Sequence, residues 1–177
     1  MWAPFIIVIA GPNGVGKTTF AQRYLKTIPE CEEFVNADEI ALSLENLPHG
    51  ERNLRAGRIA IERMDELVKQ RKSFAFESTL SGKSLAVRLT RAREKGYRII
   101  LLFLWVPSVE ETLKRIHRRS ELGGHDVPVS DVMRRHDRCY HNFHELYKGI
   151  CNEWTIYDAS FYNPRPVQQG YTDGSQR

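Results

Sequence analysis

The residues with the clearest chemistry form a glycine-rich run that ends in a lysine and a threonine. The run has the spacing G-x-x-x-x-G-K-[ST], and it follows an apolar stretch, residues 5–10, with the length of a buried strand. Glycines let backbone N–H groups turn inward around phosphate oxygens, and the N-terminus of a following helix adds partial positive charge. We therefore expect this segment to bind the phosphates of ATP. The predicted binding residues are Gly11, Pro12, Asn13, Gly14, Val15, Gly16, Lys17, Thr18 and Thr19.

Two residues of this motif have predicted roles of their own. Lys17 is expected to bridge the β- and γ-phosphates, and the Thr18 hydroxyl to bind Mg²⁺. The simplest alternative is a turn that only joins a strand to a helix, and the surrounding strand and helix patterns disfavour it. A dinucleotide-binding turn has the spacing G-x-G-x-x-G without the lysine, so the sequence excludes that reading.

The motif letters also occur in ABC-transporter ATPases, and residues 80–84 superficially extend that likeness. An ATPase of that type needs acidic residues after the apolar strand at 99–105, where they hold Mg²⁺ and polarise water. Here the strand ends in Trp105, Val106 and Pro107. The sequence therefore favours transfer of a phosphoryl group to an acceptor other than water.

Two carboxylates are candidates for work on that acceptor. Phosphoryl transfer to a hydroxyl needs a carboxylate within reach of the hydroxyl proton. Asp38 lies 21 residues after Lys17, just past a predicted strand, and is the predicted catalytic base. The alternative for Asp38 is that it only caps a short helix at 39–44. Glu77 ends the next strand and is predicted to hold acceptor hydroxyls or Mg²⁺-bound water, the alternative being a solvated strand end.

Arginines gather in the second half of the chain, where a mobile segment could close over the transferred phosphate. We expect this lid at about residues 114–135. One helix cannot point neighbouring arginines the same way, so a solvated helix face accounts for some of them. The candidates are Arg115, Arg118, Arg119, Arg134 and Arg135.

Strand patterns alternate with helical patterns, which predicts an α/β fold of the P-loop NTPase type. We expect three layers, with a mostly parallel five-stranded sheet flanked by helices and a helical lid. Ligands then bind at the carboxyl ends of the strands. The predicted strands are at 5–10, 34–36, 73–77, 99–105 and 154–157, and the predicted helices at 17–26, 51–70, 81–95, 108–120 and 130–146.

Length and composition set the wider limits. The chain has 177 residues, which suits one kinase domain at 1–162, followed by a poorly ordered tail at 163–177. Three widely spaced cysteines indicate reduced thiols in a cytoplasmic protein, and no targeting or membrane-spanning segment is expected. A net charge of +4 permits binding to anions in general.

Taken together, these residues resemble the zeta-toxin family of P-loop kinases over about residues 4–160. The segments that carry the resemblance are 11–19, NADEIA at 36–41, AGR at 56–58, FAFESTLSG at 74–82, LFLWVP at 102–107, Arg118, and GGHDVP at 123–128.

The resemblance implies an ATP-dependent kinase that phosphorylates a sugar hydroxyl of UDP-N-acetylglucosamine, with an antitoxin as a possible protein partner. It implies that Asp38 is the base and that Glu77 and Arg58 contact the substrate. Zeta toxins have two lid arginines. The first aligns with Arg118, and the position of the second falls near His125 in this sequence.

Two other functions stay open at this point. One is a kinase for nucleosides or nucleic-acid ends, which the net positive charge indicates. The sequence disfavours it because aromatic and basic residues do not interleave as in RNA-binding sheets. The other is a regulatory protein that binds and slowly hydrolyses a nucleoside triphosphate.

Overall fold

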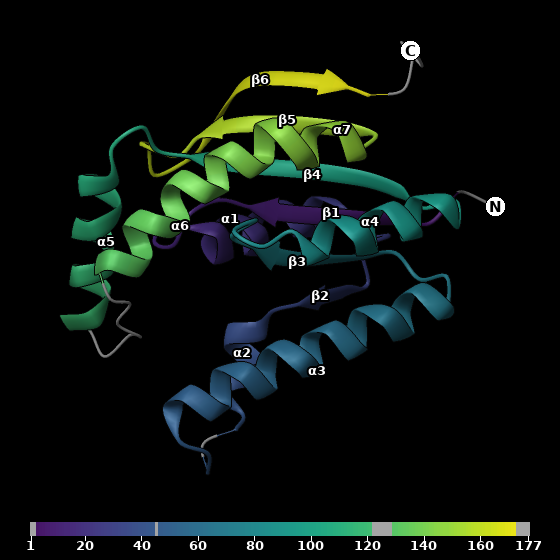
Figure 1. Cartoon of the computed structure of the whole chain (residues 1–177). Coiled ribbons are helices and arrows are strands. Elements are labelled where there is room, and N and C mark those ends of the chain that lie inside the picture. The colour runs from purple at the N-terminus through teal and green to yellow at the C-terminus, as the bar shows by residue number, and fades with distance from the viewer. Residues whose placement is uncertain (1–2, 45, 122–128, 173–177) are drawn as a thin grey trace.

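The sheet at the centre of the molecule has six strands in the order β2-β3-β1-β4-β5-β6. The computed structural model describes residues 3–44, 46–121 and 129–172. Neighbouring strands are parallel except for the β5–β6 pair, which is antiparallel (Figure 1). The strands are β1 Phe5–Ala10, β2 Glu33–Val35, β3 Phe74–Ser78, β4 Arg98–Trp105, β5 Glu153–Asp158 and β6 Arg165–Tyr171.

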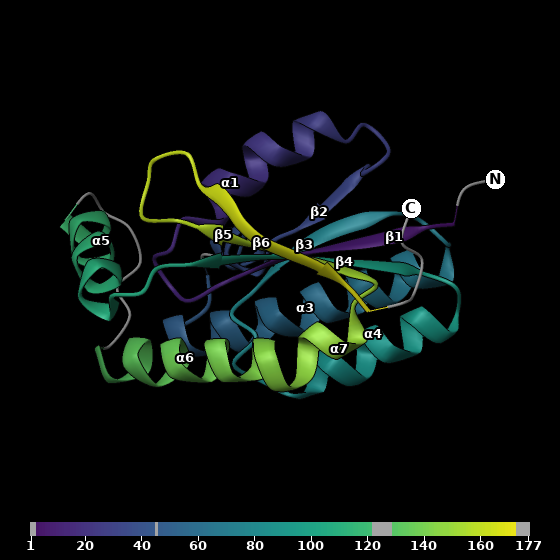
Figure 2. The same cartoon turned by 90° about the horizontal axis from the view of Figure 1, so that it is seen from above.

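Helices cover both faces of this sheet, which gives the predicted three-layer α/β fold. Figure 2 shows α1 on one face and α3, α4, α6 and α7 on the other, while α5 stands at the end where the parallel strands finish. The helices are α1 Lys17–Tyr24, α2 Ala37–Leu42, α3 His49–Lys69, α4 Ser84–Glu94, α5 Val109–Glu121, α6 Val129–Asn142 and α7 Lys148–Ile150. A 3₁₀ turn, η1 Leu25–Thr27, extends α1, and a π-helical turn, η2 Phe143–Tyr147, joins α6 to α7.

The two central strands are buried on both faces, as their unbroken apolar sequences predict. Alternate residues of β1 belong to different cores: Ile6 and Val8 pack on the side of α3, α4 and α6, whereas Ile7 and Ile9 pack against α1. This double burial fixes where β1 ends, and therefore where the glycine-rich turn begins.

The expectation of a poorly ordered tail from residue 163 is wrong for β6. This strand pairs with β5 and completes a sixth position in the sheet, where five were expected. Its residues are mostly exposed and mix polar with apolar types, so no apolar alternation marks it as a strand. Pairing with β6 satisfies the backbone N–H and C=O groups at the edge of β5. Gly170 leaves room for the Trp154 ring, which a Cβ at residue 170 would overlap.

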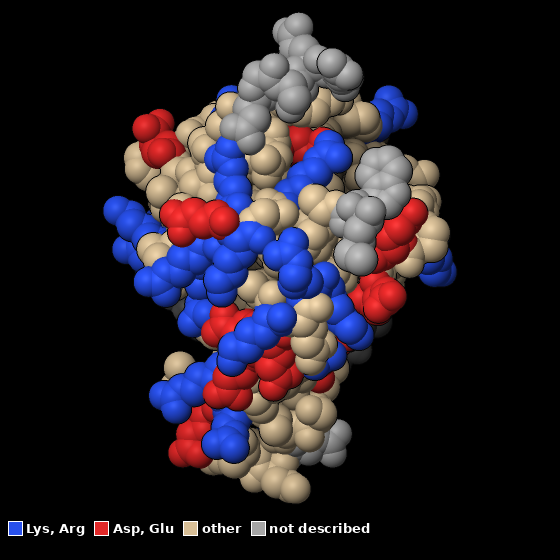
Figure 3. Space-filling model, turned by 90° about the vertical axis from the view of Figure 1, so that its right-hand side faces the viewer, with Lys and Arg blue, Asp and Glu red and all other residues tan. Residues whose placement is uncertain are grey.

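The far end of the molecule, opposite α5, carries basic residues with acidic ones between them (Figure 3). The C-termini of α3 and α4 meet here and satisfy each other's carbonyl groups. The Arg71 guanidinium donates to the Lys95 carbonyl at 3.0 Å, and the Tyr97 hydroxyl donates to the Leu67 carbonyl at 3.1 Å. Positive charge at helix C-termini complements their dipoles, which accounts structurally for cations on this face.

Within the described ranges, no helix combines the length and apolar character that crossing a bilayer requires.

The contact between Gly170 and Trp154 predicts the cost of a small substitution in β6. Gly170→Ala should lower the free energy of unfolding by about 1 to 3 kcal/mol, because the added methyl group overlaps a buried ring. Urea unfolding followed by tryptophan fluorescence measures the change. Gln169→Ala, on an exposed neighbour, should stay within about 0.5 kcal/mol of the unmodified protein. Equal stability of all three proteins would contradict the packing of β6 on β5.

Candidate functional site

The glycine-rich turn between β1 and α1 has a backbone that only glycines adopt readily. Gly11, Gly14 and Gly16 have φ angles of 151°, 76° and 98°. A Cβ on Gly11 would overlap the Leu104 carbonyl oxygen, and one on Gly14 would lie 2.6 Å from Cγ1 of Ile116 in α5. A Cβ on Gly16 would have no atom within 4 Å, so the turn is open on that side.

The lysine of the motif lies over the turn. Lys17 Nζ donates hydrogen bonds to the carbonyl oxygens of Gly11 and Pro12, both at 3.0 Å. The ammonium group is therefore held beside the open backbone, where it can reach a bound phosphate. Asn13 Oδ1 is buried and has no partner within the described part of the chain, so a further polar group in this turn is directed inward. Thr18 is half-buried and Thr19 exposed, both in the first turn of α1.

Glu77 lies beside this turn because β3 is the neighbour of β1. The Gly11 N–H donates to the Ser78 carbonyl at 3.2 Å, which ties the start of the turn to the end of β3. Burial raises the pKa of the Glu77 carboxyl, while the charge of Lys17 and a hydrogen bond with the Thr18 side chain oppose that rise. Thr18 and Glu77 thus offer hard oxygen ligands close together, which suits Mg²⁺.

Asn36 connects Glu77 to the start of α2. Its Nδ2 donates to Glu77 Oε1 at 3.2 Å, and its Oδ1 accepts from the Asp38 N–H at 2.9 Å. Because its side chain accepts the Asp38 N–H, Asn36 is the N-cap of α2, and it is 5% exposed. The alternative interpretation of Asp38 as a helix cap is wrong. Its side chain is exposed in the first turn of α2, and its charge contributes to the raised pKa of Glu77.

The predicted arginines are spread around this edge of the sheet. Arg58 is exposed on α3, beside a pocket of about 500 Å³, and Arg118 is exposed on α5. Residues 122–128, which include the predicted second lid position near His125, lie outside the described residues. The pocket beside Arg58 is lined by Leu44, Leu47, Glu51, Leu54, Arg55 and Arg58.

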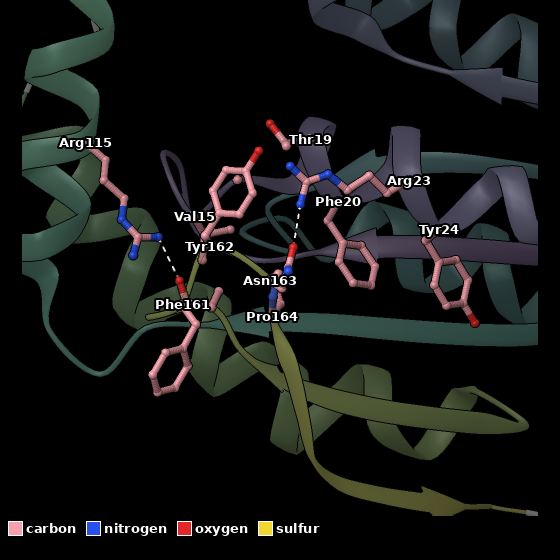
Figure 4. Close-up of a pocket in the computed structure, with 12 residues that line it drawn as sticks. Val15, Thr19, Phe20, Arg23, Tyr24, Arg115, Phe161, Tyr162, Asn163 and Pro164 are labelled. Carbon is pink, nitrogen blue, oxygen red and sulfur yellow. Dashed lines mark hydrogen bonds between the residues drawn. The ribbon is translucent and has the colours of Figure 1, made fainter.

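A second pocket, of about 550 Å³, opens next to the glycine-rich turn and was not predicted (Figure 4). It lies between α1, Arg115 of α5 and the loop between β5 and β6. Its aromatic walls and polar rim suit a planar nucleotide base. The residues that line it are Val15, Gly16, Thr19, Phe20, Arg23, Tyr24, Arg115, Ala159, Phe161, Tyr162, Asn163 and Pro164.

Two arginines fix the β5–β6 loop over this pocket. The Arg23 guanidinium donates to Asn163 Oδ1 at 2.7 Å and lies 4.4 Å from the centre of the Tyr162 ring. Arg115 donates to the Ala159 carbonyl at 2.8 Å, so this predicted lid arginine instead holds the loop. Asn163 was missed because the poorly ordered tail was predicted to begin there, although Asn163-Pro164 is itself a turn signal. Tyr162 lies at the end of the predicted domain, where no motif marks it as a site residue.

Comparison with known proteins places the chain in a family. The sequence profile of the AAA_33 family, described as an AAA domain, matches residues 6–141, and the chain belongs to this family. An uncharacterised protein of Haemophilus influenzae is 32% identical over 133 residues, covering 73% of this chain and 91% of that protein. A guanylate kinase of Rubrobacter xylanophilus is 27% identical over 141 residues, covering 65% of this chain and 69% of the kinase.

Solved structures share the fold at low sequence identity. A structure from the PezAT toxin-antitoxin system of Streptococcus pneumoniae has a TM-score of 0.71 at 17% identity, covering 96% of this chain and 72% of that chain. A chain of the Pnkp1/Rnl/Hen1 RNA repair complex has a TM-score of 0.67 at 18% identity, covering 99% and 51%. Shikimate kinase of Acinetobacter baumannii has a TM-score of 0.55 at 19% identity, covering 90% and 86%.

These findings confirm the class of fold. The chain is a P-loop protein with the fold of nucleotide-binding kinases, and the resemblance to zeta toxins holds at the level of that fold.

The raised pKa of Glu77 predicts how stability depends on pH. A carboxyl whose pKa is higher in the folded than in the unfolded protein destabilises the fold where it must ionise. Glu77→Gln should therefore stabilise the protein at pH 7 to 8, because the amide keeps the partner Asn36 without a buried charge. The gain should disappear as the pH falls below the ordinary glutamate value of 4.5, where Glu77 is protonated in both states.

Urea unfolding of the two proteins between pH 4 and pH 8 measures this difference. Glu39→Gln, on the exposed side of α2, controls for the loss of one negative charge near the site. A Glu77→Gln protein that is less stable than the unmodified protein at pH 8 would show that the ionised carboxylate is a net stabilising group.

Proposed function

We propose that this protein is a kinase that transfers the γ-phosphate of ATP to a hydroxyl of a small acceptor, with UDP-N-acetylglucosamine as the first acceptor to test. The observation that carries the proposal is the arrangement at the end of β1 and β3. There the phosphate-binding turn with Lys17 and Thr18 lies beside Glu77 and the start of α2. A nucleotide site next to paired carboxylates supports transfer to an acceptor rather than nucleotide binding alone.

In this proposal the two halves of ATP are bound by different elements. The base enters the pocket under the β5–β6 loop, and the phosphates lie on the backbone of residues 11–16 with Lys17 on the β- and γ-oxygens. Thr18 and Glu77 are the residues that would hold Mg²⁺, and the metal would supply positive charge that neutralises the phosphate oxygens.

The acceptor hydroxyl is activated by a carboxylate of the site, Asp38. Asp38 is exposed in the first turn of α2, where the Asn36 cap fixes the backbone that carries it. It takes the proton of the attacking hydroxyl as the new oxygen–phosphorus bond forms, while the bond from the γ-phosphorus to the β,γ-bridging oxygen breaks and ADP leaves. Arg118 of α5 neutralises charge that develops on the transferred group, and Arg58 of α3 contacts the acceptor.

A kinase for nucleosides or nucleic-acid ends is the second candidate. The guanylate kinase relative and the fold shared with a chain of an RNA repair complex favour it. The likeness to a toxin-antitoxin system supports an antitoxin as a protein partner. Three free cysteines, two of them buried, support a location in the reducing cytoplasm.

Replacement of the proposed base tests the transfer step. With γ-labelled ATP, Mg²⁺ and UDP-N-acetylglucosamine, guanosine or RNA with 5′-hydroxyl ends, one acceptor should gain label. Asp38→Asn should lower that transfer by about 10² to 10⁴ fold, because the amide cannot accept the proton, while ATP affinity stays unchanged. Transfer that survives in Asp38→Asn would exclude Asp38 as the base. ATP binding without transfer to any acceptor would refute the kinase proposal.

The base pocket gives a separate prediction about ATP binding. Tyr162→Ala should weaken ATP binding about tenfold, because an aromatic surface against the base is lost together with the Arg23 contact. Calorimetric titration with ATP measures the change. Tyr171→Ala removes an exposed tyrosine from β6 outside this pocket, and its affinity should match that of the unmodified protein. Equal affinities for all three would exclude this pocket as the base site.

A further inference from the structure

The loop between β3 and α4 contains a left-handed residue in an unusual place. Leu80 has a φ of 51° and is 1% exposed, so a bulky side chain is buried on a backbone that glycine would adopt more easily. This conformation costs about 1 to 2 kcal/mol for an L-residue and persists only where the surroundings enforce it. Leu80 follows Glu77 by three residues, and its N–H donates to Ser78 Oγ at 3.0 Å.

Two side chains from one distant element enforce this turn. Asn142 Nδ2 donates to the Leu80 carbonyl at 2.6 Å, and the Tyr147 hydroxyl donates to the Gly82 carbonyl at 2.5 Å. Asn142 is 5% exposed and its hydrogen bond to Leu80 is shielded from water, whereas the bond from the buried Tyr147 reaches the exposed Gly82 and is only partly shielded. Burial also raises the pKa of Tyr147 to about 12.

The π-helical turn η2 explains how both side chains reach the same loop. Asn142 caps η2 and Tyr147 is its last residue, five positions later. In an α-helix, residues five apart point about 140° away from each other. A π-helical turn bonds residues five apart, so they come to the same side. The extra width of η2 therefore directs Asn142 and Tyr147 together at residues 80–82.

The loop that these residues hold borders the acceptor side of the site. It starts at Ser78, whose carbonyl accepts from the Gly11 N–H, and it carries the Thr79 and Ser81 hydroxyls 2.8 Å apart on either side of Leu80. Glu77 is held in place by the pairing of β3 with β1, whereas the orientation of these two hydroxyls relative to the phosphate-binding turn depends on the direction the chain takes at Leu80.

We propose that Asn142 and Tyr147 are positioning residues for the acceptor: they hold the left-handed turn at Leu80 and thereby place the Thr79 and Ser81 hydroxyls to bind the acceptor. The proposal rests on the kinase function above. It assigns to η2 a part in acceptor recognition, separate from ATP binding, which uses α1 and the β5–β6 loop.

Tyr147→Phe tests this role, because it removes one hydroxyl and keeps the buried ring. With UDP-N-acetylglucosamine as acceptor, or whichever tested acceptor gains label, the KM for the acceptor should rise at least fivefold. The KM for ATP and the dissociation constant of ATP should stay within twofold. Hydrogen exchange of the backbone amides at residues 80–83 should become faster. Tyr140→Phe removes a hydroxyl from the exposed side of α6 and should change none of these quantities.

Asn142→Asp provides a second variant of nearly the same shape that loses the donated hydrogen bond. Its acceptor KM should also rise. The double variant should raise the acceptor KM by less than the product of the two single fold-increases, because both side chains act on one loop. An unchanged acceptor KM in both variants, or equal losses for acceptor and ATP, would overturn the positioning role. Absence of any transfer by the unmodified protein would instead refute the kinase proposal, and this role with it.

Discussion

The close approach of the phosphate-binding turn to its neighbours is the constraint on which the site depends. Gly11 lies against the Leu104 carbonyl of β4, Gly14 lies against Ile116 of α5, and the Gly11 N–H is bonded to the end of β3. Three elements from distant parts of the chain thus pack against one turn, which has no room for a side chain at Gly11 or Gly14. The turn therefore fixes where β3, β4 and α5 meet, besides offering its N–H groups to phosphate.

This arrangement brings a carboxylate to a place where burial disfavours its charge. Glu77 is stabilised there by Lys17, Thr18 and Asn36, yet burial still raises its pKa. A fold selected for stability alone would place an amide or apolar group at this position. A costly carboxyl beside the lysine of a P-loop motif is characteristic of sites where charge is used for binding or reaction.

Much of the fold could be predicted because the buried strands carry unbroken apolar sequences and the phosphate-binding motif has a defined spacing. The five parallel strands and the placement of Lys17, Asp38 and Glu77 at one edge follow from these patterns. Strand β6 could not be predicted, because an exposed edge strand is held by backbone pairing that leaves no apolar pattern. The capping role of Asn36 was missed because Asp38 also suits a helix start.

Contacts between residues far apart in the chain set a second limit on what can be predicted from the sequence. The hydrogen bond from Asn142 to Leu80 spans 62 residues, and the one from Arg23 to Asn163 spans 140. No local sequence pattern identifies the hydrogen-bond partner of either side chain. The pocket under the β5–β6 loop and the strained loop at Leu80 therefore form only when the sheet has brought α1, α6 and the β5–β6 loop together.

In a kinase of the proposed kind, pairing of the edge strand β6 would also be coupled to nucleotide binding. The loop that lines the proposed base pocket is the hairpin connection between β5 and β6, so pairing of the two strands contributes to holding the loop in place, together with Arg23 and Arg115. Occupancy of the pocket and pairing of the last strand are then linked equilibria, and each must favour the other by the same free energy. A protein or fused segment that competes for the edge of β5 would lower nucleotide affinity from a distance, without touching the phosphate-binding turn.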